Sequence, residues 1–143
     1  MRVDFYQVGS DPAETVVALI ARNTLKAGKR LLVVASEPDR LDRISNALWG
    51  RSDTFLANGR AGAGHEARQP VLLSETLEAT NGASFLALAD GTWRAPDGFD
   101  RVFLVFDNST IDHARGVWRE LGGQDGTERH FWKQEGGRWI EAA

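Results

Sequence analysis

The chain has 143 residues, of which 42% are hydrophobic and 26% charged, with a formal net charge of −3. This length can bury a real core, so we expect residues 1–143 to form a single domain. The net negative charge argues against a protein that coats nucleic acid, and the absence of cysteine excludes disulfides and thiolate metal sites. No apolar run is long enough for a signal peptide or a membrane span, which favours a cytoplasmic protein without a membrane partner.

The N-terminal segment predicts a strand followed by a helix. Val3–Val8 is typical of a strand, and the letters SDPAET then predict a helix start. We expect Asp11 as the N-cap, Pro12 at the first helical position and Glu14 in a capping box. The apolar stripe of this helix is Ala13, Val16, Val17, Ile20 and Thr24.

The next segments continue the alternation of strands and helices. Leu31–Ser36 is a continuous apolar run, typical of a strand that is covered on both faces. A second helix should follow it and end at Gly50, with three residues facing inward: Leu41, Ile44 and Leu48. After a glycine-rich loop at 58–69, PVLLS and FLALAD predict two further strands, with a turn between them.

The last third of the chain predicts one strand, one helix and a hairpin. Arg101–Phe106 is the strongest strand signal, and Asn108 or Ser109 can cap a helix that runs through Leu121. The C-terminal segments suggest a hairpin around Gly136–Gly137. The strand–helix–strand order predicts an α/β sandwich with a largely parallel sheet and some antiparallel pairing at its edge.

Several features imitate catalytic motifs without completing one. The glycines of 59–64 have neither the P-loop nor the dinucleotide spacing, which favours a flexible connector. Asp107 ends a strand, as a magnesium-binding acid would, but without a phosphate loop upstream it is better explained as a helix cap. The histidines lack metal-ligand spacing: His65, His113 and His130. We therefore expect no catalytic residue, no metal and no cofactor.

The third predicted helix carries the clearest recognition signal. Its buried face consists of four residues: Ile111, Ala114, Val117 and Leu121. Trp118 borders that face, and Arg115 and Arg119 follow around the helix. Such a surface suits a carboxylate attached to a hydrophobic side chain, as at the end of a peptide. The alternative is a tryptophan at the edge of the core beside two solvated arginines, with Arg115 paired to Asp112.

A second candidate surface surrounds Trp49 and Phe55. Trp49 lies at the border of the apolar face of its helix, and Phe55 follows polar neighbours. Paired, partly exposed aromatic residues are common at protein interfaces. The alternative is that both residues cover the end of the core under the glycine-rich loop.

The succession of these segments resembles one family over nearly the whole chain. The segments that carry the resemblance are FY, GKRLLVV, LDRISNALW, DTFLANGRAG, QPVLLS, FDRVFLVFDN, ARGVWR and the terminal FWKQ and GRW. Together they resemble the chi subunit of bacterial DNA polymerase III. The resemblance implies a mixed, Rossmann-like α/β/α sandwich and a non-catalytic accessory subunit of the replicative polymerase.

The resemblance also implies partners and their sites. Members of the family bind the acidic C-terminal tail of single-stranded DNA-binding protein, and they bind the psi subunit, which links them to the clamp loader. The tail site carries over onto Arg115 and Arg119, with Trp118 as an aromatic wall and Phe106 as its apolar neighbour. The surface of Trp49 and Phe55 is implied to bind psi, or a repair helicase that competes with psi.

The sequence departs from the family at two positions, and two other function classes stay open. Ile111 stands where some relatives carry a basic residue, so the tail site is less positive here, and Asn58 stands where relatives often have histidine. A nucleotide-binding α/β enzyme would hold its ligand at the carboxyl ends of the strands. A direct binder of single-stranded DNA would expose tryptophans as stacking platforms, which the net negative charge disfavours.

Overall fold

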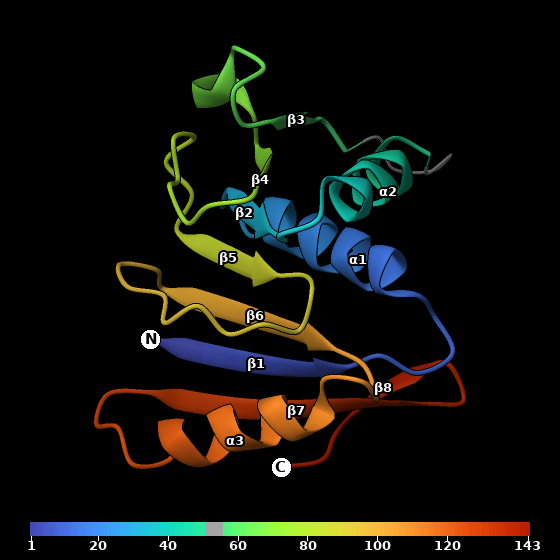
Figure 1. Ribbon diagram of the computed structural model, residues 1–143, viewed down its shortest axis with the longest axis vertical. Coiled ribbons are helices and arrows are strands. Elements are labelled where there is room, and N and C mark those ends of the chain that lie inside the picture. Colours follow the sequence, from blue (N-terminus) through green and yellow to red (C-terminus); the bar gives the residue numbers. More distant parts are fainter. Residues whose placement is uncertain (51–55) are drawn as a thin grey trace.

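A computed structural model describes residues 1–50 and 56–143, and its strands form one mixed sheet (Figure 1). Within these residues the strand order across the sheet is β3-β4-β2-β5-β6-β1-β7-β8. The strands are β1 (Arg2–Gln7), β2 (Leu31–Val34), β3 (Asn58–Arg60), β4 (Val71–Ser74), β5 (Phe85–Leu88), β6 (Arg101–Phe106), β7 (Glu128–Glu135) and β8 (Arg138–Glu141). The helices are α1 (Ala13–Lys26), α2 (Pro38–Trp49) and α3 (Ile111–Leu121).

All neighbouring strands run parallel except the C-terminal pair. β7 and β8 are antiparallel and form the predicted hairpin, with Glu135 opposite Arg138. The other pairs join strands that are separated by long crossovers, as parallel pairing requires. The predicted α/β class, the largely parallel sheet and its antiparallel edge are therefore confirmed.

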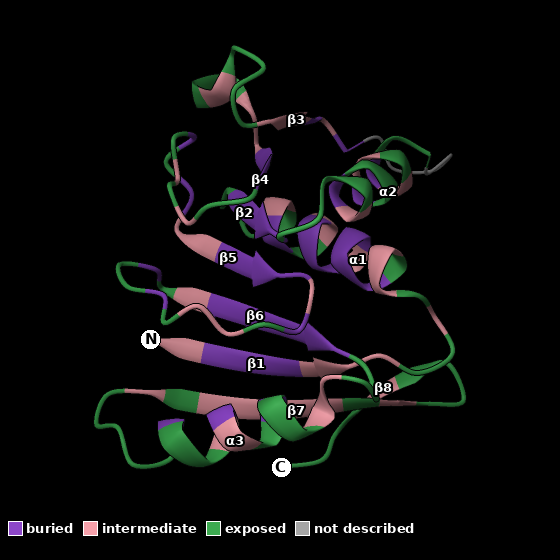
Figure 2. Ribbon diagram, in the orientation of Figure 1, coloured by how far each residue is buried: buried purple, intermediate pink, exposed green. Residues whose placement is uncertain are grey.

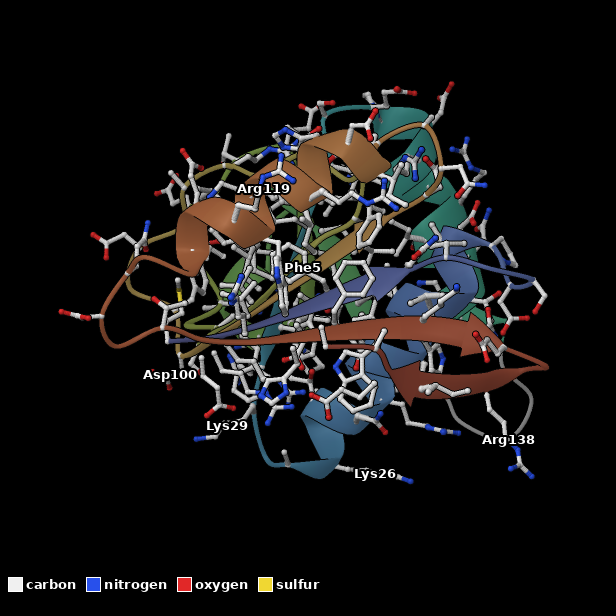
Figure 3. The ribbon with its side chains drawn as sticks, turned by 90° about the horizontal axis from the view of Figure 1, so that it is seen from below. Phe5, Lys26, Lys29, Asp100, Arg119 and Arg138 are labelled. Atoms are coloured by element: carbon white, nitrogen blue, oxygen red, sulfur yellow. The ribbon has the colours of Figure 1, made fainter. Side chains whose placement is uncertain are left out.

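Helices cover both faces of the sheet, which produces two cores. Alternate residues of β2 point to opposite sides: Leu31 and Val33 pack with α1 and α2, whereas Leu32 and Val34 pack in the core that α3 completes. All four are fully buried, as the continuous apolar run predicted. Figure 2 shows the buried segments along the central strands, and Figure 3 shows α3 and α1 on opposite sides of the sheet.

A buried carboxylate ties β1 to both of its neighbours. Asp4 has no exposed surface. It accepts hydrogen bonds from Arg101 Nε of β6 at 2.8 Å, from Trp132 Nε1 of β7 at 3.0 Å and from Arg2 Nε at 3.1 Å. Burial raises the pKa of Asp4, but these hydrogen bonds outweigh it and the pKa lies below its usual value. The charge is therefore retained inside the sheet because its oxygen atoms are satisfied.

The predicted N-cap of α1 is wrong. Pro12 occupies the cap position and no side chain caps the helix. Asp11 instead accepts a 2.8 Å hydrogen bond from Gln134 Nε2, and Glu14 pairs with Arg43 of α2 at 3.0 Å. Both carboxylates are engaged by partners far away in the sequence, which replaces the local capping box.

The predicted N-cap of α3 is also wrong. Thr110 is the cap residue, rather than Asn108 or Ser109. Asp107 organises the turn before the helix, because its Oδ1 accepts hydrogen bonds from Ser109 N at 2.9 Å and Ser109 Oγ at 2.5 Å. These bonds lower the pKa of Asp107. Asp107 therefore shapes the turn into α3, close to the predicted structural role.

The glycine-rich loop is partly ordered by the sheet. Asn58–Arg60 forms β3 and pairs in parallel with β4, which a purely flexible connector would not do. Arg60 Nη1 also lies 2.7 Å from Asp42 Oδ1 of α2. The turn that follows uses Gly62 and Gly64 at φ of +87° and +89°, where other residues would be strained.

Candidate functional site

The exposed side of α3 has the composition that the sequence predicted. Ala114, Val117 and Leu121 are buried against the sheet. Trp118 is half-buried at the border of this face, and Arg115 and Arg119 are exposed. The helical periodicity therefore placed the aromatic residue and the two cations correctly.

An aromatic cluster holds Trp118 in place. The Trp118 ring meets Phe5 edge-on at 5.2 Å between centroids and Phe131 of β7 at 5.7 Å. Phe106 packs against Phe131 from the core side, with 5.5 Å between the ring centroids. Phe106 is only 2% exposed and Phe5 is fully buried, so both support the cluster rather than offer surface to a partner. Trp118 and Phe131 are the half-buried members that a partner can reach.

The two helix arginines differ in their surroundings. Arg115 Nη1 lies 3.8 Å from Asp112 Oδ1, and the two side chains are 59% and 97% exposed, so this ion pair contributes little. Arg119 makes no hydrogen bond or ion pair with the residues that the structure describes. Both guanidinium groups are thus available to an anionic partner.

Arg119 follows Trp118 directly and lies about 100° around the helix from it. Arg119 lines a shallow hollow of about 580 Å³ together with His113, Gly116 and Glu120. Gly116 and Glu120 are each two positions from Trp118, which is roughly 200° around the helix. The hollow therefore opens on the side of α3 away from Trp118. Arg119 lies between the hollow and Trp118, one turn after Arg115 and only about 40° around the helix from it.

Sequence reasoning missed a third arginine at this surface. The guanidinium carbon of Arg129, in β7, lies 4.2 Å from the centroid of the Trp118 ring. Its Nη1 donates a 2.6 Å hydrogen bond to the carbonyl oxygen of Trp118. Arg129 and Phe131 are alternate residues of one strand and so share the face under α3. That alternation is visible in ERHFWKQE, but the sequence does not show which element covers it.

The second predicted surface is described only in part. Trp49 ends α2 and is 43% exposed, whereas Phe55 lies outside the described residues. Nearby, the buried Asn58 accepts a 2.7 Å hydrogen bond from Ser45 Oγ and donates to the Leu56 carbonyl at 3.0 Å. Asn58 therefore fastens the start of β3 to α2.

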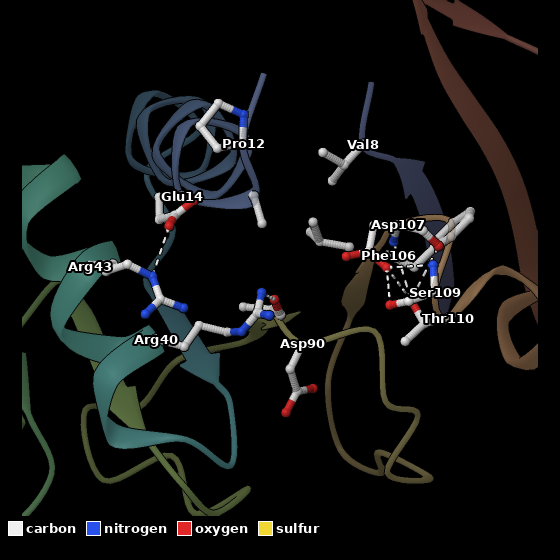
Figure 4. Close-up of a pocket in the computed structure, with 13 residues that line it drawn as sticks. Val8, Pro12, Glu14, Arg40, Arg43, Asp90, Phe106, Asp107, Ser109 and Thr110 are labelled. Carbon is white, nitrogen blue, oxygen red and sulfur yellow. Dashed lines mark hydrogen bonds and ion pairs between the residues drawn. The ribbon is translucent and has the colours of Figure 1, made fainter. Parts of the chain in front are cut away.

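A polar cavity of about 270 Å³ lies where β5, β6 and β1 end (Figure 4). Glu14 and Arg43 pair across one side of it, and Arg40 Nη1 donates to the Ala89 carbonyl at 3.2 Å. This is the place where an α/β enzyme would hold a nucleotide. The glycine-rich loop does not contribute to the lining, and the Arg43 cation already has a carboxylate partner.

The part of the chain that the structure describes has neither a cluster of metal ligands nor a helix suited to a membrane. Within residues 1–50 and 56–143, no three His, Cys, Asp or Glu side chains gather as metal ligands would. None of the helices described there combines the length and apolar character that a membrane span needs.

Comparison with known proteins gave one family. The family model described as DNA polymerase III chi subunit, HolC, matches residues 1–128. No curated protein matches the chain. The matched residues include all of α3, whereas Arg129 and Phe131 lie just beyond them.

Proposed function

The chain belongs to the DNA polymerase III chi subunit family, and from this premise we propose that it binds the acidic C-terminal tail of single-stranded DNA-binding protein. In this role it is a non-catalytic accessory subunit of the replicative polymerase. It connects the clamp-loader complex to coated DNA through a protein contact, without itself touching the nucleic acid.

The exposed face of α3 is the observation that carries this proposal. Arg115 and Arg119 present two available cations on a molecule whose net charge is −3. Trp118 and Phe131 offer half-buried aromatic surface beside Arg115. An acidic peptide that ends in a hydrophobic residue matches both features, because guanidinium groups bind carboxylates and the aromatic surface accepts the last side chain.

We further propose that the end of α2 binds the psi subunit, or a repair helicase that competes for the same surface. The exposed Trp49 supports this, since large aromatic residues anchor protein interfaces. α2 packs in the core on one side of the sheet and α3 completes the core on the other side. Both partners can therefore bind at the same time.

The tail site is tested by reversing one charge. Arg119→Glu is expected to leave folding intact, because the side chain is exposed, and to abolish binding of an acidic peptide ending in Phe. Loss of one charge-assisted contact alone weakens binding roughly ten- to a hundredfold. Fluorescence anisotropy of the labelled peptide measures the affinity, and circular dichroism checks the fold.

A matched variant distinguishes an effect at the proposed site from an effect of the changed net charge. Arg138→Glu makes the same change in β8, at a position that Figure 3 shows well away from Arg119, and should bind the peptide nearly as wild type does. Equal titrations for wild type and Arg119→Glu would remove the proposed site.

A further inference from the structure

We propose that Arg129 grips the terminal carboxylate of the bound tail, while Arg115 and Arg119 attract the acidic residues that precede it. This inference rests on the proposed tail binding and adds a residue from β7, outside the matched residues 1–128. It makes the site a joint surface of α3 and β7 rather than of the helix alone.

The hydrogen bonding of Arg129 leaves the edge of its guanidinium group that carries Nε and Nη2 without a partner among the described residues. Nη1 is used by the carbonyl oxygen of Trp118, at 2.6 Å. Nε and Nη2 make no hydrogen bond with the residues that the structure describes. These two N–H groups point in the same direction and are spaced like the two oxygen atoms of a carboxylate, so they can donate to both at once.

Arg129 is also held by closer contacts than the other two arginines of this surface. Its guanidinium carbon lies over the Trp118 ring, 4.2 Å from the ring centroid, and the side chain is half-buried. Arg115 is 59% exposed with a distant partner, and Arg119 has none among the described residues. Binding a carboxylate therefore costs Arg129 less side-chain freedom than it costs the helix arginines.

The apolar part of the ligand has a place beside this cation. Phe131 follows Arg129 by two residues in β7, so both side chains lie on the same face of the strand. The Phe131 ring meets Trp118 at 5.7 Å, and both rings are half-buried. A terminal phenylalanine whose carboxylate is held by Arg129 can lay its ring against these two.

Gly122 provides a way to move the guanidinium group without removing its charge. A Cβ atom at Gly122 would lie 2.9 Å from three atoms of the Arg129 guanidinium group. Gly122 has φ of −63°, which alanine adopts freely. In Gly122→Ala the flexible end of Arg129 must therefore shift away from its place over Trp118.

The test compares two peptides on four proteins. An acidic peptide ending in Phe is prepared with a free C-terminal carboxylate and with a C-terminal amide, and anisotropy titrations are made with wild type, Arg129→Gln, Gly122→Ala and the control Arg138→Gln. For the free acid we expect at least a tenfold loss with Arg129→Gln, a clear loss with Gly122→Ala and none with the control. For the peptide with the C-terminal amide, the three variants should have the same affinity as wild type.

Each outcome bears on one of the two proposals. If Arg129→Gln and Gly122→Ala weaken the acid and the amide equally, Arg129 only supports Trp118 and the inference is overturned. If Arg129→Gln and Gly122→Ala bind the free-carboxylate peptide as tightly as wild type does, while Arg119→Glu no longer binds it, the inference fails and the tail site stands. If the wild-type protein does not bind the free-carboxylate peptide at low ionic strength, the proposed function itself fails and this inference fails with it.

Discussion

Asp90 joins two loops at the carboxyl end of the sheet. Its carboxylate accepts hydrogen bonds from Arg94 at 2.7 and 2.8 Å, from Ser36 N at 2.9 Å and from Thr92 N at 3.3 Å. Burial raises the pKa of Asp90, but the bonds from Arg94, Ser36 and Thr92 outweigh it and lower the pKa to about 2. The ionised form is therefore strongly favoured in the folded protein.

This shift predicts a specific acid sensitivity. The pKa rises from about 2 in the folded state to 3.8 in the unfolded state, so the stabilisation is complete above pH 4 and is lost as pH falls toward 2. Its full size is about 2 to 3 kcal/mol, at about 1.4 kcal/mol per pKa unit. Urea unfolding of wild type and Asp90→Asn should show this difference at pH 6 and less than half of it at pH 2.5. A difference that does not change with pH would contradict the assignment.

At the scale of elements, the sequence predicted the helices, most strands and the ends of α2 and α3 correctly, but it predicted the wrong N-caps for α1 and α3. The periodicity of α3 and the apolar run of β2 report burial, which each segment carries in its own residues. The start of α1 depends on a distant partner. Gln134 takes Asp11 away from α1, and no pattern near Asp11 could reveal a residue so far along the chain.

The candidate site was predictable where its residues lie on one helix, but not where a second element contributes to it. Arg115, Trp118 and Arg119 follow from one helical wheel. Arg129 comes from β7, and its place over Trp118 results from the packing of α3 on the sheet, which single-sequence patterns do not encode.

The end of α2 carries its own prediction. Trp49→Ala should weaken co-purification with the psi subunit and leave tail-peptide binding unchanged, because α2 and α3 pack on opposite sides of the sheet. Ile140→Ala is the matched control, since Ile140 in β8 is 44% exposed and Trp49 is 43% exposed. Co-purification that survives Trp49→Ala would count against this surface.

At the scale of the whole molecule, local charge and net charge have opposite signs. A chain with net charge −3 should repel an acidic tail, whereas the arginines around α3 attract it. We therefore expect tail affinity to fall severalfold as salt rises from about 0.05 M to about 0.5 M, because screening shortens the reach of exposed charges. Arg119→Gln should show a flatter salt dependence in anisotropy titrations. Affinity that is constant in salt for wild type would indicate a purely apolar contact.

The position of β1 has a consequence for how the protein is made. β1 precedes its two neighbours by a long stretch of sequence, because its hydrogen-bonding partners begin at Arg101 in β6 and Glu128 in β7. Both sides of β1 can be paired, and Asp4 can meet both Arg101 and Trp132, only after β6 and β7 have been translated. We therefore expect this half of the sheet to form late, once β7 is available, and to leave the apolar residues of β1 exposed in the partly made chain until then.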